Sequence, residues 1–458
     1  MRAISKYAAA LAGLLALASS PSGFTPSLNA APENIEGQSG SDITLRTELG
    51  QKHHYTEQGG KTYLRIDLEG IRHREAERTP VNIAIVIDKS GSMNGAKIEQ
   101  AKEAAIMAVE RLGKNDYLSI IAYSDTVDVL LPSTRVNNFT EFRHRIRSIR
   151  SSGRTALYAG TKRGINELDS YLDKNRVNRV ILLSDGLANV GPSSPDQLEE
   201  LGRKAAEKGI SITTIGLGLG FNEDLMTKLA YASDGNHAFV RHERDLVDIF
   251  NKEFGDVLSV VAQDVDIFID CHIGFRPIRV LGREAEIDGR RIRLKLNQLY
   301  AAQEKNLIIE IERTEAVDPG RTPLADVTVA YRSMRDKTRH KVSASPEIDY
   351  SKDRSLAEGS KVKRVMSSVI EQIATERNER AVSLRDKGKV EEARRVLKDN
   401  AAYLRQNAQD LGGSFAPTLN ELADKNLKDS KNLDNRNWTA SRKEMKARQY
   451  KQKTQQSY

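Results

Sequence analysis

The feature that most constrains the fold is a regular alternation of apolar, β-branched runs with segments of helical periodicity. It begins at Pro80, and the first run, Val81–Ile87, is apolar apart from Asn82, as expected of a strand buried on both faces. Similar runs and helical segments follow one another for about 180 residues. This alternation predicts an α/β domain over 80–258 with a doubly wound, mostly parallel, Rossmann-like sheet.

The rest of the chain divides by pattern into segments of other kinds. The predicted segments are a signal peptide at 1–30, a linker with N-terminal strands at 31–79, a β-rich, sandwich-like domain at 259–350, a helical hairpin at 351–412 and a basic, polar tail at 413–458. The tail is expected to be mobile or to form a short helix near Arg442–Tyr450. The strands of Asp42–Leu68 could join the β-rich region, which would make the α/β domain an insertion within a sandwich.

The first residues have the pattern of a secretory signal. Arg2 and Lys6 are basic, and Ala8–Ala18 is an apolar run that is too short to span a bilayer. Small residues follow, which places cleavage near Ala18 or near Ala30; an uncleaved anchor helix is the alternative. No later stretch reaches transmembrane length. We therefore expect a secreted, periplasmic or cell-envelope protein.

Composition excludes several classes of site. The single cysteine, Cys271, cannot form an intrachain disulfide or a cysteine-rich zinc site. The formal net charge of +8 permits contact with anionic surfaces, but the aromatic residues of the basic tail form no stacking stripe. Nucleic acid is therefore not expected as a partner. His242-Glu243 begins like a zinc-protease motif, but Leu246 stands where the second histidine is required.

One loop carries the donor pattern of a hard-cation site. Asp88, Ser90 and Ser92 follow the point where a predicted buried strand ends and a helix begins, which is where ligands bind in doubly wound sheets. Asp185 ends another predicted strand, and Thr155 lies just before a helix. All three loops should reach the same edge of the sheet. Carboxylate and hydroxyl oxygens suit a cation such as Mg²⁺.

These five residues match the metal-ion-dependent adhesion site of von Willebrand factor type A domains, which the segment 80–258 resembles in order and spacing. The resemblance implies that Ser90 and Ser92 bind the metal directly, and that Thr155 does so directly or through water. It implies that Asp88 and Asp185 act largely through waters. An open coordination position would take a carboxylate of a partner protein. The ion could be Mg²⁺, Mn²⁺ or Ca²⁺, because an oxygen-only site with an open position discriminates poorly.

One residue departs from the family's pattern. Members often have Gly-Gly-Thr where this chain has Gly153-Arg154-Thr155, and Arg154 could either steer an acidic ligand or partly block the site. The wider order of segments is similar to that of bacterial Ca-activated chloride channel homologues and of inter-alpha-trypsin inhibitor heavy chains. That similarity implies no pore, since the sequence shows no transmembrane segment.

The sequence therefore predicts a non-enzymatic module that binds a partner protein through a divalent metal ion, for adhesion or assembly outside the cytoplasm. The partner would present an acidic residue, and the basic tail could contact an acidic envelope surface. Two alternatives stay open at this point. One is a metal-assisted hydrolase that uses the same ion. The other is an assembly scaffold with a vestigial metal site, in which the C-terminal helices mediate assembly.

Overall fold

The computed structural model describes residues 36–456 apart from residue 58 and residues 74–77. The predicted signal peptide at 1–30 lies outside the described residues. The described part belongs to one compact unit that begins at Glu36. Within that part, no helix is both long enough and apolar enough to cross a membrane.

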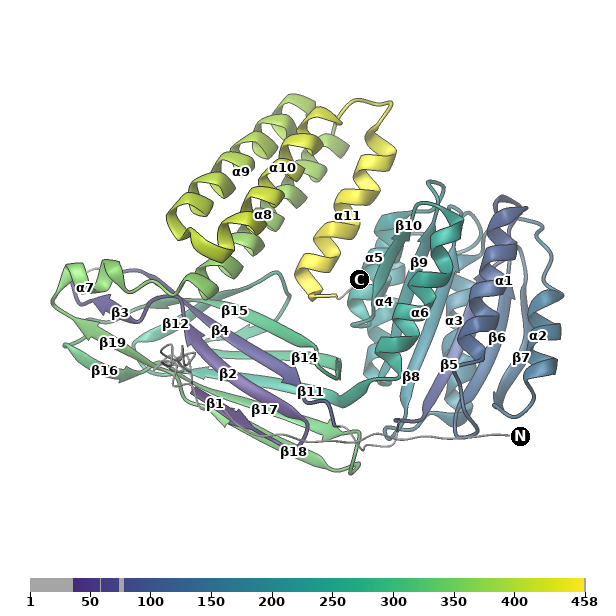
Figure 1. Ribbon diagram of the computed structural model, residues 1–458, viewed down its shortest axis with the longest axis horizontal. Helices are drawn as coiled ribbons and strands as arrows, with labels where there is room; N and C mark the ends of the chain where they lie inside the picture. The colour runs from purple at the N-terminus through teal and green to yellow at the C-terminus, as the bar shows by residue number, and fades with distance from the viewer. Residues whose placement is uncertain (1–35, 58, 74–77, 457–458) are drawn as a thin grey trace, which may run out of the picture. The chain divides into compact units, whose positions relative to one another are not determined.

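The segment predicted as an α/β domain has that fold (Figure 1). Its strands are β5 (Val81–Asp88), β6 (Tyr117–Tyr123), β7 (Val127–Arg135), β8 (Val177–Ser184), β9 (Ile210–Leu217) and β10 (His237–Val240). They form one sheet in the order β10-β9-β8-β5-β6-β7. All neighbours are parallel except β6 and β7, which are antiparallel. Every residue of β5, β8 and β9 is buried, which explains their continuous apolar runs.

Helices cover both faces of this sheet. They are α1 (Ala96–Val109), α2 (Phe139–Arg147), α3 (Leu157–Leu168), α4 (Pro195–Glu207), α5 (Glu223–Ala232) and α6 (Leu246–Val257). Helices α1, α2 and α6 share one apolar core with the sheet, whereas α3, α4 and α5 share the other. Helix α4 begins at a capping box in which Ser194 and Gln197 satisfy each other's backbone amides, with Pro195 at the first helical position.

Two further sheets share a second core, and the strands before and after the α/β domain combine in them. The first sheet has the order β1-β2-β4-β15-β12 and the second the order β13-β14-β11-β17-β18; a three-stranded sheet, β16-β19-β3, contributes Ile348 and Tyr350 of β19 to the same core. Strand β4 precedes the α/β domain and pairs antiparallel with β15, which follows it. The structure thus confirms that the α/β domain is inserted within a sandwich. The bounds are β1 (Glu36–Ser39), β2 (Ile43–Leu49), β3 (His53–Tyr55), β4 (Lys61–Gly70), β11 (Val260–Cys271), β12 (Phe275–Leu281), β13 (Glu286–Asp288), β14 (Arg291–Tyr300), β15 (Glu304–Arg313), β16 (Gly320–Pro323), β17 (Ala325–Ser333), β18 (Arg339–Ala344) and β19 (Glu347–Ser351).

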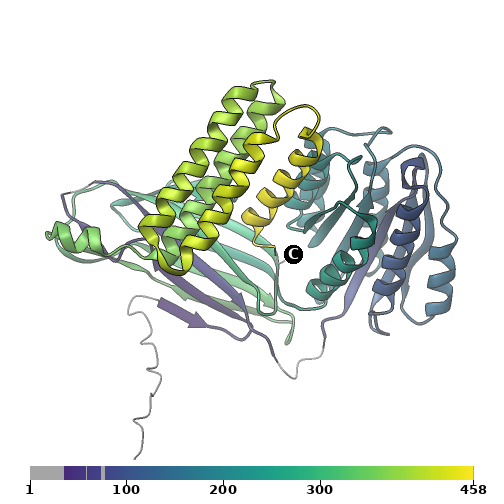
Figure 2. The same cartoon turned by 45° about the horizontal axis from the view of Figure 1, so that its top comes forward.

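The C-terminal part is helical throughout, which differs from the predicted hairpin followed by a polar tail. Its helices are α7 (Arg354–Gly359), α8 (Lys363–Asp386), α9 (Val390–Leu411), α10 (Ala416–Lys431) and α11 (Trp438–Thr454). The expected short helix near Arg442–Tyr450 is the middle of α11. Figure 2 shows α11 in yellow at the end of the colour scale. The rest of the tail prediction was wrong because its sparse apolar residues, such as Leu419 and Met445, are buried in the cores that these helices share.

The basic residues of α11 bind acidic and carbonyl groups of the α/β domain. Arg442 donates to Glu223 and Asp224 at the start of α5, at 2.5 and 2.6 Å, and to Asp386 at the end of α8, at 2.8 Å. Tyr450 donates its hydroxyl to the backbone carbonyl of Gly235 at 2.7 Å. Charges that look solvated in the sequence therefore hold α11 between the α/β domain and the other C-terminal helices.

Removing Arg442 should destabilise this contact. Its side chain is 16% exposed and is shared by three carboxylates, of which Glu223 also pairs with Lys443 and Asp224 with Lys446. In Arg442→Ala, loss of the hydrogen bonds between Arg442 and these charged groups should cost about 2 kcal/mol, so the midpoint of thermal unfolding should fall by several degrees. Arg244→Ala is the matched control, because Arg244 is 82% exposed and its ion pair with Asp245 spans 3.8 Å. Equal effects of the two substitutions would contradict this account.

His237 makes the same region sensitive to acid. Burial lowers the pKa of its imidazole from 6.5 to about 3, and Nδ1 lies 2.8 Å from the hydroxyl of Thr214. Between these pKa values the unfolded chain binds a proton that the folded chain does not, so stability is lost as pH falls below 6.5. At pH 5 the loss should be about 2 kcal/mol.

His237→Gln should remove that part of the pH dependence, measured by denaturant unfolding at pH 7 and pH 5. His340→Gln is the control, because the His340 ring is partly exposed and lies 2.8 Å from the Asp336 carboxylate. An unchanged difference between the two pH values in His237→Gln would refute the assignment.

Candidate metal centre

Three loops at the carboxyl edge of the α/β sheet bring the five predicted residues together. Asp88 is the last residue of β5, and a short 3₁₀ helix, Gly91–Met93, then leads towards α1. Asp185 directly follows β8, and Thr155 lies two residues before α3. The carboxyl ends of parallel strands meet at one edge of a sheet, which is why residues nearly a hundred positions apart become neighbours.

The side chains form a connected set of oxygens. The hydroxyls of Ser90 and Ser92 lie 3.1 Å apart, and Ser92 donates to Oδ1 of Asp185 at 2.7 Å. Asp88 accepts from the backbone amide of Ser90 at 2.8 Å and from the hydroxyl of Ser184 at 2.6 Å. These hydrogen bonds fix the orientation of both carboxylates.

Gly186 shows that three hydroxyls surround a single point. A Cβ atom added to Gly186 would lie 2.7 Å from Oγ1 of Thr155, 3.3 Å from Oγ of Ser92 and 3.6 Å from Oγ of Ser90. The absence of a side chain at this position therefore leaves a small space lined by hydroxyl oxygens. Gly186 is a site residue that the sequence interpretation missed, although its place directly after a strand-end aspartate was a usable signal.

The centre contains two buried carboxylates and one ammonium group. Asp88 and Asp185 are fully buried, and burial raises the pKa of the Asp88 carboxyl. Lys97 of α1 forms an ion pair with Oδ2 of Asp185 at 2.5 Å, a contact that the sequence interpretation also missed. The described residues hold no group of three or more His, Cys, Asp or Glu side chains that could bind a metal. A cation here would therefore depend on hydroxyls as well as carboxylates, and this oxygen-only donor set fits Mg²⁺, Mn²⁺ or Ca²⁺.

Backbone hydrogen bonds hold the loops against one another. The amide of Gly91 donates to the carbonyl of Gly153 at 2.9 Å, and the amide of Ser152 donates to the carbonyl of Lys89 at 2.7 Å. The amide of Thr155 donates to the side chain of Asn189 at 2.8 Å. The donor atoms thus belong to a preorganised set of loops.

Arg154 does not lie free beside the centre. Its Nε donates to Oδ1 of Asp125 at 2.8 Å, and its backbone amide donates to Oδ2 of the same residue at 2.9 Å. This pairing gives the guanidinium a partner other than the oxygens of the centre. The side chain is 69% exposed, and the Asp125 carboxylate offsets its positive charge at the surface near the loop.

The single cysteine offers no competing site. Burial raises the pKa of the Cys271 thiol to about 12, so the reactive thiolate is scarce at neutral pH. The neighbouring His272 lies 3.2 Å from the carboxylate of Asp326. Cys271 is part of the sandwich core.

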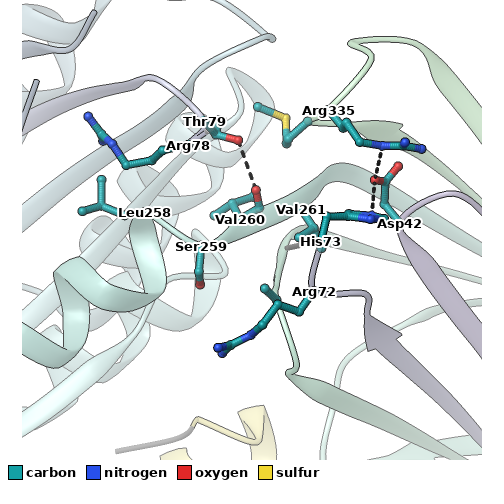
Figure 3. Close-up of a pocket in the computed structure, with 12 residues that line it drawn as sticks. Asp42, Arg72, His73, Arg78, Thr79, Leu258, Ser259, Val260, Val261 and Arg335 are labelled. Carbon is teal, nitrogen blue, oxygen red and sulfur yellow. Dashed lines mark hydrogen bonds and ion pairs between the residues drawn. The ribbon is translucent and has the colours of Figure 1, made fainter. Parts of the chain in front are cut away.

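A separate cavity of about 140 Å³ lies between the α/β domain and the sandwich (Figure 3). It adjoins Thr79 and Val260, so it lies at the start of β5, whereas the oxygens described above lie at its end. Its buried carboxylate, Asp42, is paired with His73 at 3.1 Å and Arg335 at 3.4 Å. The cavity is therefore distinct from the candidate metal centre.

Comparisons with known proteins identify the α/β domain. The family model described as the von Willebrand factor type A domain matches residues 82–252. This chain contains a von Willebrand factor type A (VWA) domain. Such domains typically mediate protein–protein interactions, which agrees with a role in adhesion or assembly.

Individual relatives share this domain at modest identity. The protein sll0103 of Synechocystis sp. is 25% identical over 278 residues, covering 58% of this chain and 65% of that protein. Inter-alpha-trypsin inhibitor heavy chain H3 of Pongo abelii is 36% identical over 170 residues, covering 35% of this chain and 19% of that protein. The match thus spans less than two thirds of either relative. A solved structure, von Willebrand factor type A from Catenulispora acidiphila, has a TM-score of 0.68 at 15% identity and covers 89% of this chain and 92% of its own, which supports the fold.

Filling the space at Gly186 should interfere with a cation held by the three hydroxyls. The φ angle of Gly186 is not positive, so Gly186→Ala should keep the backbone while its methyl group displaces the hydroxyl of Thr155. We expect the affinity for Mg²⁺, measured by calorimetric titration of the full chain, to fall at least tenfold, about 1.4 kcal/mol. Gly255→Ala is the control, because nothing lies within 4 Å of the added atom. Unchanged affinity in Gly186→Ala would place the cation elsewhere.

Proposed function

We propose that this protein is a non-enzymatic, divalent-metal-dependent module that binds a partner protein outside the cytoplasm, as part of a secreted or envelope protein. The observation that carries the proposal is the convergence of three hydroxyls and two buried carboxylates at the carboxyl edge of the VWA sheet. Mg²⁺ is the ion that this donor set fits, with Mn²⁺ or Ca²⁺ as substitutes.

The donor types explain how such a centre would recognise a partner. Ser90, Ser92 and Thr155 would contribute neutral oxygens, so the ion would keep most of its positive charge. Asp88 and Asp185, already fixed by hydrogen bonds to serines, would act largely through waters. When bound, the ion would supply an electrophilic position that attracts a carboxylate of the partner. The chain's own residues would hold and orient that ion.

A hydrolase that uses the same ion is the less favoured alternative. Hydrolysis would need a general base beside the open position. The side chains that contact the oxygens of the centre are serine and threonine hydroxyls, carboxylates fixed by hydrogen bonds, and the Lys97 ammonium. This set is suited to holding a cation and a carboxylate.

Affinity capture with the full chain as bait tests the proposal. We expect envelope proteins that bind in Mg²⁺ to be lost in EDTA and in Ser90→Ala, and retained in Ser152→Ala. Ser152 is exposed and lies in the adjacent loop, so it matches Ser90 in chemistry without belonging to the donor set. Asp88→Ala is a poorer choice, because it would leave the buried hydroxyl of Ser184 and the amide of Ser90 without an acceptor.

Calorimetric titration with MgCl₂ supplies a second readout that needs no partner. Ser90→Ala should weaken Mg²⁺ binding at least tenfold, about 1.4 kcal/mol, whereas Ser152→Ala should leave it unchanged. Identical capture with Mg²⁺, with EDTA and with Ser90→Ala would show that the interface lies elsewhere on the chain.

A further inference from the structure

Two leucines are exposed beside the candidate metal centre. Leu187 is 58% exposed and Leu219 is 45% exposed, and both lie in loops at the carboxyl edge of the VWA sheet. A single exposed leucine is common on protein surfaces and needs no explanation. These two lie on different loops at the same edge of the VWA sheet as the candidate site.

Both leucines are next in sequence to residues that touch the centre. Leu187 directly follows Gly186, whose added Cβ would meet the three hydroxyls. Leu219 lies between Gly218 and Gly220. A Cβ on Gly220 would lie 2.5 Å from the carbonyl oxygen of Asp185, and one on Gly218 would lie 3.7 Å from Nζ of Lys97. The backbone at both leucines therefore lies close to the donor set.

Contacts with the rest of the protein fix the backbones of the two loops that carry the leucines. Phe221, two residues after Leu219, is 1% exposed, and its carbonyl accepts a hydrogen bond from Lys443 of α11. The Lys443 ammonium also lies 4.2 Å from the centre of the Phe221 ring. On the other loop, Ala188 packs against the apolar core, and the amide of Asn189 donates to the carbonyl of Thr155 at 3.1 Å. Leu187 and Leu219 are thus presented to solvent from fixed backbones, which lowers the entropy cost of binding.

Two ion-paired basic side chains lie near the leucines. Lys97 beside Gly218 has a side chain that is 32% exposed, and Arg154 on the neighbouring loop is 69% exposed. Lys97 is paired with Asp185 and Arg154 with Asp125, so the proposed metal ion would supply the uncompensated positive charge beside the apolar side chains. A ligand that is both acidic and apolar complements this surface, whereas a purely polar acidic ligand leaves the leucines in water.

We propose that Leu187 and Leu219, the apolar rim, bind a large aliphatic or aromatic side chain that lies within two residues of the partner's metal-binding carboxylate. The occupant is thus an extended segment of a partner protein with an acidic residue next to an apolar one. This inference rests on the proposed function, because the carboxylate is placed by the metal ion. It adds a specificity determinant that the ion cannot supply, since the ion accepts any carboxylate.

Peptide display against the full chain tests the rim. The probe is a random dodecapeptide library. The baits are the wild-type protein, the double variant Leu187→Ser/Leu219→Ser and Ser90→Ala. Leu356→Ser is the matched control. Leu356 is 45% exposed, as Leu219 is, but lies on α7. In Mg²⁺, wild type and Leu356→Ser should enrich peptides in which an apolar residue lies within two positions of an acidic one. The double variant should enrich acidic peptides without the apolar neighbour.

A synthetic peptide from the enriched set gives the quantitative test. Replacing its apolar residue by serine should weaken binding to wild type about tenfold, because burying a leucine-sized side chain is worth about one such factor. The same replacement should cause no further loss in the double variant, since the two changes remove one interaction.

The results of the peptide display distinguish a failure of the proposed apolar rim from a failure of the proposed metal-dependent function. Enrichment of acidic peptides with no apolar preference, equal in wild type and in the double variant, would overturn the rim and leave the proposed function standing. Enrichment that persists in EDTA and in Ser90→Ala, or no enrichment above the library, would overturn the proposed function and the rim together.

Discussion

The antiparallel pairing of β4 with β15 is the interaction on which the rest of the structure depends. These strands lie on opposite sides of the VWA domain in sequence, and they pair from Lys61 opposite Glu312 to Glu69 opposite Glu304. Their pairing closes the sandwich around both connections to the inserted domain. Buried Arg179, near the start of β8, reinforces the junction because it donates to Gln298 at 2.6 Å and to the hydroxyl of Tyr300 at 2.7 Å on β14. The amino edge of the VWA sheet is thereby tied to the sandwich, so the carboxyl edge carries the loops of the candidate metal centre.

The candidate centre holds two carboxylates close together, and the neighbouring side chains that the structure describes supply only one positive charge to compensate them. Asp88 and Asp185 end adjacent strands, and neither is exposed. Serine hydroxyls and the Lys97 ammonium stabilise these carboxylates, at distances between 2.5 and 2.7 Å. A divalent ion would add charge compensation where burial otherwise disfavours ionisation of Asp88, which makes metal affinity and the geometry of these loops mutually dependent.

The sequence predicts the parts of this protein that depend on local pattern. The apolar run Val81–Ile87 predicts a strand buried on both faces, and the structure has such a strand there. The same run places Asp88 at the carboxyl end of the strand. The five predicted donor residues come together because strand ends share an edge. What the sequence did not reveal depends on tertiary contacts. The sequence around Arg442 suggests a solvated charge, because its partners Glu223 and Asp386 are distant in the chain. The sequence around Lys97 likewise gives no sign of its ion pair with Asp185. Gly186 was missed because its role depends on three hydroxyls from two other loops.

The contacts of α11 also set an order on folding. The carbonyls of Phe221 and Gly235 and the amide of His237 find their partners on Lys443, Tyr450 and Gln456, more than two hundred residues later in the chain. During synthesis, the VWA domain precedes α11, so these groups on the α5 and β10 side lack their native partners until α11 has left the ribosome. A nascent chain that stalls before α11 would display buried polar groups and the Phe221 loop without its anchor, which is the kind of surface that chaperones and proteases recognise.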